Sequence, residues 1–103
     1  MKSKPNPGIL YTFGSSIWQH SSQGGWYFVT VPFEISSEIR ENLKWQEEGW
    51  GRMRAIAKIG ATEWQTAIWY DRKINSYLLP VKEDVRLAEN LKAGDLIVVK
   101  ISV

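Results

Sequence analysis

The residues best suited to bind a charged ligand are basic residues at alternate positions of one predicted strand. Arg52, Arg54 and Lys58 fall on one face of the strand expected over residues 50–59, because strand side chains alternate between two faces. Such a stripe could contact phosphate groups. It could also be a solvent-facing surface whose charges discourage edge pairing. The second interpretation is favoured because the other charges of the chain are balanced.

Six tryptophans are many for a chain of 103 residues, and they cannot all enter one small core. Trp45 and Trp50 flank a polar segment, so we expect them to be exposed. They would then contact a sugar, a base or a protein, or form a lid over the mouth of the fold. Trp64 belongs to the same candidate surface. Trp26 and Trp69 lie in apolar strands, so we expect them in the core.

No set of residues in the sequence assembles a catalytic or metal site. His20 is the single histidine, cysteine is absent, and nothing in the spacing brings a nucleophile to the imidazole. Glu47 with Glu48, and Glu83 with Asp84, are adjacent acids, whereas glycoside hydrolysis needs two carboxylates facing across a cleft. We therefore expect a surface histidine, solvated acids, no catalytic residue, no metal and no cofactor.

Hydrophobic spacing predicts a mainly β chain with two short helices. Pro32 and Pro80 end two of the strands because proline donates no hydrogen bond to a sheet. Ser36 or Ser37 is expected to cap the first helix. The expected strands cover residues 9–18, 26–31, 50–59, 62–70, 76–79 and 96–103, and the second helix covers residues 82–90. Because the last strand is almost wholly apolar, we expect both of its faces to be buried.

A segment in the middle of the chain recurs near its end. Residues 31–44 align without gaps on residues 79–92, and both copies begin with an apolar residue and proline and end in Glu-Asn-Leu-Lys. The half-repeats cover about residues 9–59 and 60–103, and each reads hairpin, proline, short helix, strand. Six strands can close into a small barrel without exposed edges. We therefore predict a closed six-stranded barrel with an internal pseudo-twofold repeat; an open sandwich is the alternative.

Size and charge narrow the classes of protein. A chain of this length has room for one core, so we expect a flexible tail over residues 1–8 and one domain over residues 9–103. The net charge is +2, and neither half carries the basic field usual in nucleic-acid binders. No run approaches the length of a membrane span, and the N-terminus lacks the apolar core of a signal peptide. We expect a cytoplasmic protein with no membrane partner.

Several short runs, taken in their order and spacing, resemble the domain-of-unknown-function family 1905. They are WYFVTVP at 26–32, WQTAIW at 64–69, YLLPVK at 77–82, VR at 85–86 and GDLIVV at 94–99. The resemblance covers about residues 9–103 and departs at Ala67, where the family would place serine. It implies a double-split β-barrel, similar in fold to the swapped-hairpin barrels of transition-state regulators and addiction-module antitoxins, which bind DNA as dimers. Because one chain here supplies both halves, we expect a folded monomer.

The resemblance implies no particular activity, and a shared fold does not imply a shared function. We favour a non-catalytic binding or interaction module for an unknown small molecule or protein. Nucleic-acid binding is the first alternative, and an enzyme with a carboxylate-based site is the second. Arg86 has a structural alternative, a buried ion pair with Asp95. The expected ligand-binding residues are Trp45, Trp50, Arg52, Arg54, Trp64, Thr66 and Arg86.

Overall fold

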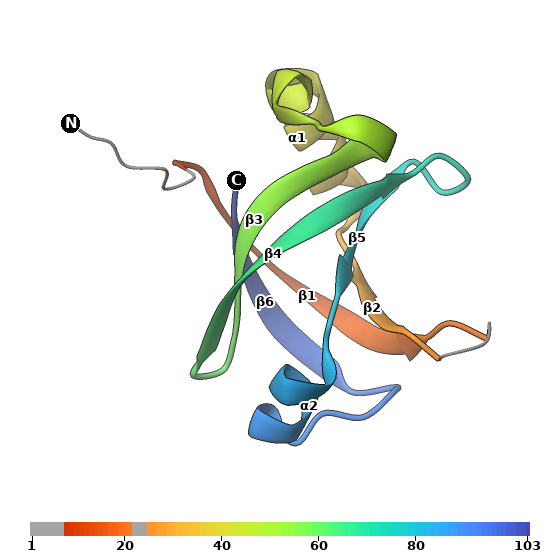
Figure 1. The fold of residues 1–103 in the computed structure, drawn as a ribbon, viewed down its shortest axis with the longest axis vertical. Coiled ribbons are helices and arrows are strands. Elements are labelled where there is room, and N and C mark those ends of the chain that lie inside the picture. The colour runs from red at the N-terminus through yellow and green to blue at the C-terminus, as the bar shows by residue number, and fades with distance from the viewer. Residues whose placement is uncertain (1–7, 22–24) are drawn as a thin grey trace.

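Six antiparallel strands form a closed barrel in the computed structural model, which describes residues 8–21 and 25–103 (Figure 1). The strands follow the ring order β1-β2-β5-β4-β3-β6, and β6 pairs with β1 to close it. They are β1 Leu10–Gln19, β2 Tyr27–Thr30, β3 Arg52–Ile59, β4 Thr62–Asp71, β5 Ser76–Pro80 and β6 Leu96–Ser102. The predicted closed barrel is confirmed. The predicted tail lies outside the described residues except for Gly8.

Two helices lie at opposite ends of the barrel (Figure 1). The helix α1 covers Phe33–Leu43 and the helix α2 covers Glu83–Glu89, each following a strand that ends near a proline. Exchanging β1 with β4, β2 with β5 and β3 with β6 leaves every strand pairing unchanged, so the ring has the predicted pseudo-twofold order. None of the helices in the described part of the chain is long and apolar enough to cross a membrane.

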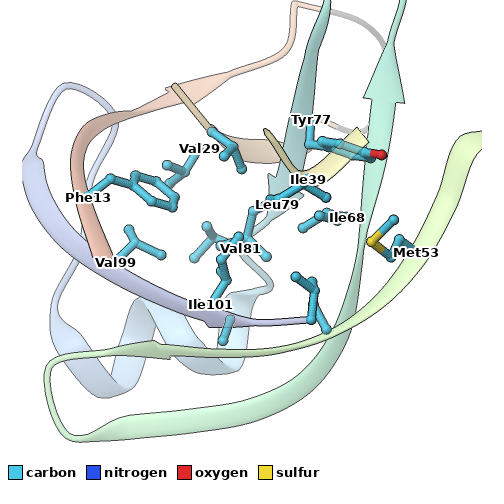
Figure 2. Packing of buried hydrophobic residues seen from close by; sticks show 14 of the residues in the cluster. Phe13, Val29, Ile39, Met53, Ile68, Tyr77, Leu79, Val81, Val99 and Ile101 are labelled. Atoms are coloured by element: carbon cyan, nitrogen blue, oxygen red, sulfur yellow. The ribbon is translucent and has the colours of Figure 1, made fainter. Parts of the chain in front are cut away.

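The core fills the inside of the barrel with one face of every strand (Figure 2). In β3, Met53 and Ala55 are buried while Arg54 is exposed, which confirms the predicted alternation. Figure 2 shows Tyr77 at the margin of the cluster, with its hydroxyl pointing out of it. Ile39 of α1 closes one end of the core. The strands therefore present a second, outward face that is available for function.

The predicted burial of both faces of β6 is wrong. Leu96 and Val98 are 78% and 63% exposed, whereas Val99 and Ile101 are buried. A closed barrel buries only the inner face of a strand unless a helix covers the outside, and neither helix covers β6. An apolar run alone could not reveal that one of its faces is open.

The serine predicted to cap the first helix has another role. The helix begins directly after Pro32, whose φ of −52° already suits a helix start, so Ser36 falls inside the first turn. Its buried hydroxyl donates to the Val31 carbonyl at 3.0 Å and accepts the Tyr77 N–H at 3.0 Å. Ser36 therefore ties α1 to β5.

Candidate functional site

Aromatic side chains gather on the outside of the barrel across the neighbouring strands β1, β2, β5 and β4. Alternation turns Trp18, Phe28 and Trp69 outward, because the residues beside them fill the core. Trp18 lies opposite Phe28 in the sheet, and Phe28 lies opposite Pro80. The Trp18 and Phe28 ring centroids are 5.1 Å apart, and the Trp26 ring stacks on Phe28 at 6.3 Å. We call Trp18, Trp26, Phe28, Trp69 and Pro80 the outer aromatic face.

Two tryptophans of this face are open to solvent. Trp26 is 63% exposed and Trp69 is 39% exposed, so the prediction that both lie in the core is wrong. Val29 of β2 and Ile68 of β4 fill the inner positions, and Trp26 lies directly before β2 while Trp69 follows Ile68 on the other face. The sequence did carry the signal: Gln65 shares the parity of Trp69 along β4, and a polar residue at that parity marks the outer face.

A hollow of about 550 Å³ lies between these two tryptophans. Ala67 is only 6% exposed although it belongs to the outer face of β4, so its neighbours cover it at the base of the hollow. The lining residues are Trp26, Arg52, Arg54, Gln65, Thr66, Ala67, Trp69 and Pro80, and we call this space the Trp69 hollow. It combines flat apolar walls with guanidinium groups.

The arginines of the Trp69 hollow are partly neutralised by one carboxylate. Glu48 pairs with Arg52, and its other oxygen lies 3.2 Å from Arg54 Nε. The Arg54 side chain is still 80% exposed. Arg52 lies 5.8 Å from the Trp69 ring centroid, within cation–π range. The hollow thus has a modest positive charge and is not strongly basic.

A second hollow of about 250 Å³ lies between β2, the end of β5 and α2. It is lined by Gly25, Trp26, Tyr27, Pro80, Val81, Lys82, Glu83 and Arg86, and we call it the Arg86 hollow. The Arg86 guanidinium lies over the Tyr27 ring at 3.8 Å, and its Nε donates to the Val81 carbonyl at 3.2 Å. The alternative of an ion pair with Asp95 is wrong: the ion pairs among the described residues do not join Arg86 and Asp95, and the Asp95 carboxylate accepts the Lys92 N–H in its own turn.

Glu47 belongs to a part-buried polar network, so its prediction as a solvated acid is wrong. Its Oε2 accepts hydrogen bonds from the Tyr77 hydroxyl at 2.5 Å and from Arg40 at 3.0 Å. The Arg40 guanidinium also lies 3.7 Å from the Tyr70 ring centroid. Burial first, and then the hydrogen bond and charge of Glu47, raise the pKa of Tyr77 far above its usual value. This network joins α1 to β4 and β5, which is a structural role.

Beside this network is a third hollow, of about 480 Å³, which Trp50 lines. Trp50 is 92% exposed and has φ of 68°, a left-handed conformation that is strained for a bulky side chain. His20 is at the surface, as predicted, with its ring 6.2 Å from that of Trp18. Across residues 8–21 and 25–103, no three His, Asp or Glu side chains are grouped so that they could hold a metal ion.

The family model of a domain of unknown function, DUF1905, matches residues 13–101, which is most of the chain. The chain belongs to this family. The resemblance drawn from the sequence is thereby confirmed. No curated protein matches the chain. Since the family description states no activity, the function of this DUF1905 domain has to be inferred from the geometry of its own surface.

The predicted ligand-binding residues lie at several separate places on the DUF1905 domain. Arg52, Arg54 and Thr66 line the Trp69 hollow together, and Arg86 lines the hollow beside it. Trp64 is on the inner face of β4 and packs against the core, on the opposite side of the sheet from Arg54. The other two tryptophans are exposed outside the barrel strands: Trp45 in the 3₁₀ turn Lys44–Gln46 and Trp50 in the 3₁₀ turn Gly49–Gly51.

Proposed function

We propose that this DUF1905 domain is a non-catalytic binding module that holds a polypeptide partner against its outer aromatic face. The observation that carries the proposal is the pair Trp26 and Trp69, both exposed on either side of the Trp69 hollow. Tryptophan and arginine dominate the energetics of protein interfaces when a partner covers them. Trp69 projects from β4 of the closed sheet, and the Trp26 ring, directly before β2, is stacked on Phe28, so little conformational entropy would be lost on binding.

The charges around the Trp69 hollow support a polypeptide more than a nucleic acid. Glu48 pairs with both Arg52 and Arg54, so one carboxylate offsets part of their charge. The whole chain has a net charge of +2. A nucleic-acid site usually neutralises several phosphates at once, which requires a denser set of unpaired cations.

Selection from a random linear peptide library displayed on phage, with the full chain as bait, tests the proposal. Individual peptides from the selection would be synthesised and their binding measured by fluorescence anisotropy. We expect micromolar dissociation constants that increase at least about tenfold in the double variant Trp26→Ala, Trp69→Ala, since truncation of even one hot-spot tryptophan costs about 2 kcal/mol or more. Trp50→Ala is the matched control, because Trp50 is exposed but lies outside this face.

Retention of full affinity by the double variant would place the binding surface elsewhere and overturn the proposal. Failure to enrich any peptide over several rounds would overturn it as well. Thermal denaturation of each variant shows whether the fold is intact, and the exposure of both tryptophans predicts that it is.

One observation favours single-stranded nucleic acid as the second candidate. Arg52 is within cation–π distance of Trp69, and exposed tryptophans beside arginine can stack on bases while the arginine contacts phosphate. Anisotropy of labelled single-stranded and duplex oligonucleotides at low and physiological salt tests it. Micromolar binding that weakens steeply with salt and with the double change Arg52→Ala, Arg54→Ala would support this candidate. No binding at low salt would eliminate it.

A further inference from the structure

The two hollows on the outer surface share a boundary. Trp26 and Pro80 line both the Trp69 hollow and the Arg86 hollow, so the two spaces lie on either side of one apolar ridge. We infer that the two hollows together form one elongated site for an extended peptide that has an apolar centre and acidic residues at both ends. This inference rests on the proposed function and specifies its partner.

The ridge and its flanks would take the apolar centre of the peptide. Trp26 is 63% exposed yet stacked on Phe28, with 17° between the ring planes, so its indole is supported from below and open above. Pro80 lies opposite Phe28 in the sheet. On one flank the covered Ala67 lets a side chain approach closely, and on the other the Tyr27 ring lies beneath Arg86. Apolar and aromatic side chains would bury most area here.

Each end of the elongated site has two cations and one carboxylate. Lys82 and Arg86 line one end together with Glu83, and the guanidinium of Arg86 is held in place by Tyr27 and the Val81 carbonyl. Arg52 and Arg54 line the other end, where Glu48 pairs with both. The excess positive charge is therefore split between the two ends and separated by the apolar ridge. A partner that matches this pattern has acids at both of its ends.

Strand geometry sets the spacing of those acids. Arg52 lies opposite Trp69, and Trp69 lies opposite Leu78, which puts Arg52 two strands away from β5, or about 10 Å. Lys82 follows Leu78 by four residues, or about 13 Å along an extended chain. The two ends are then roughly 16 Å apart. Since an extended peptide advances about 3.3 Å per residue, acidic residues about five positions apart would reach both ends.

Matched synthetic peptides test the charge pattern. The bipolar peptide is fluorescein-labelled Asp-Asp-Leu-Pro-Trp-Leu-Asp-Asp. A second peptide has the same composition with all four aspartates at one end, and a third has asparagine in place of every aspartate. We expect the full chain to bind the bipolar peptide at least about tenfold more tightly than either control, as measured by anisotropy at physiological salt. Equal affinity for the bipolar and one-ended peptides would overturn the inference.

Charge reversal at exposed positions tests each end separately. Lys82→Glu and Arg54→Glu are suitable because both side chains are exposed, whereas Arg86 is half-buried and supports its surroundings. Each charge reversal is expected to raise the dissociation constant of the bipolar peptide about tenfold. Two further peptides have lysines in place of the aspartates at one end, one peptide at its N-terminal end and the other at its C-terminal end. Each should restore binding to a different variant. Lys58→Glu is the control, since Lys58 shares the outer face of β3 but lines neither hollow.

The outcomes separate this inference from the proposed function. If phage-selected peptides require Trp26 and Trp69 but show no preference for acids at both ends, the binding module stands and the elongated bipolar site is wrong. The two-ended site is also wrong if one lysine-containing peptide restores binding to both charge-reversal variants, or if neither peptide restores binding to either variant. Tighter binding of single-stranded oligothymidylate than of any peptide would overturn both proposals.

Discussion

The two helices occupy equivalent positions in the repeat, yet they contact the barrel differently. Buried hydrogen bonds hold α1 against the barrel, whereas a hollow lies between α2 and the strands. In the first half, the buried Ser36 hydroxyl bridges the Val31 carbonyl and the Tyr77 N–H. Its counterpart in the second half is Asp84, which is exposed. Arg86 there lies over Tyr27 beside open space. The repeat preserves the backbone order, while the contact between helix and barrel has diverged.

The two helices also differ in charge at matching positions. Glu34 and Glu38 of the first half correspond to Lys82 and Arg86 of the second. Glu38 accepts a hydrogen bond from the Tyr11 hydroxyl at 3.0 Å, whereas Arg86 stacks on an aromatic ring. At these two matching positions the first half is therefore acidic and the second half basic. In a fold of repeated halves, this kind of surface difference is where function is most readily placed.

A longer connection in the first half explains the locked helix. Pro32 and Pro80 are 48 positions apart, while Lys58 and Lys100 are 42 apart, so the first half holds six more residues between helix and strand. Glu47, within that connection, reaches back to Arg40 and Tyr77. The same connection supplies the carboxylate that holds the arginines of the Trp69 hollow. The extra residues thus stabilise one end and position part of the binding surface.

The largest expected effect comes from removing the carboxylate of this connection. Glu47→Ala leaves Arg40 and the Tyr77 hydroxyl without their shared partner, and the Glu47 side chain is only 10% exposed. We expect a loss of about 3 kcal/mol in the free energy of unfolding, measured by urea denaturation. Glu83→Ala, in the exposed first turn of α2, is the control and should change it by under about 1 kcal/mol. A loss below about 1 kcal/mol in Glu47→Ala would contradict the locking role.

Removing the buried hydroxyl of α1 should have the next largest effect. Ser36→Ala leaves the buried Tyr77 N–H without its acceptor, which is expected to lower the free energy of unfolding by about 2 kcal/mol. Asp84→Ala, at the equivalent exposed position, should lower it by less than about 1 kcal/mol. Chemical denaturation of both variants measures the difference between the halves. Equal effects would mean that the two helices are held to the barrel in the same way.

Alkaline pH should lower the free energy of unfolding through the Tyr77 hydroxyl. The pKa of Tyr77 is raised in the folded state, chiefly by burial and then by Glu47, so the folded protein keeps a proton that the unfolded chain loses above about pH 10. Stability from this group is complete below that pH and falls as pH rises further, by up to about 1.4 kcal/mol per pH unit. The free energies of unfolding of the wild type and of Tyr77→Phe would be measured by urea denaturation at several pH values. Their difference isolates the contribution of the Tyr77 hydroxyl. A difference that does not change with pH would contradict the assignment.

Local patterns predicted the architecture well because they follow from single elements. The alternation of β3 placed Met53 inside and Arg54 outside, and the two prolines marked where the strands ended. The repeat then fixed the number of strands and their closure. The alternation and the strand ends need only residues near one another in sequence, and the repeat needs only a comparison of two segments of the chain.

The site could be predicted only in part, because its contacts join distant residues. Arg52 and Arg54 were found from spacing, but the apolar neighbours of Trp26 suggested burial without revealing which face of the strand it would occupy. Glu47 and Tyr77 are 30 positions apart, so nothing in the local sequence indicated their hydrogen bond. Arg86 illustrates the same difficulty: its guanidinium lies over the ring of Tyr27, which comes from the other half of the chain, although its hydrogen bond to the Val81 carbonyl is local.

The smallest expected effect concerns the strained tryptophan of the longer connection. Trp50 has φ of 68° and is 92% exposed, so its side chain adds little packing while its backbone is strained. Trp50→Gly relieves this strain but makes the unfolded chain more flexible, so we expect a gain of only about 0.5 kcal/mol in the free energy of unfolding. Trp45→Gly, exposed in a 3₁₀ turn with ordinary backbone angles, should instead lower stability slightly. Opposite signs in the two variants, measured by denaturation, would show that the connection carries strain at Trp50. A lower free energy of unfolding in both variants would mean that the backbone at Trp50 is not strained. The longer connection would then order the surface through Glu47 and Glu48 alone.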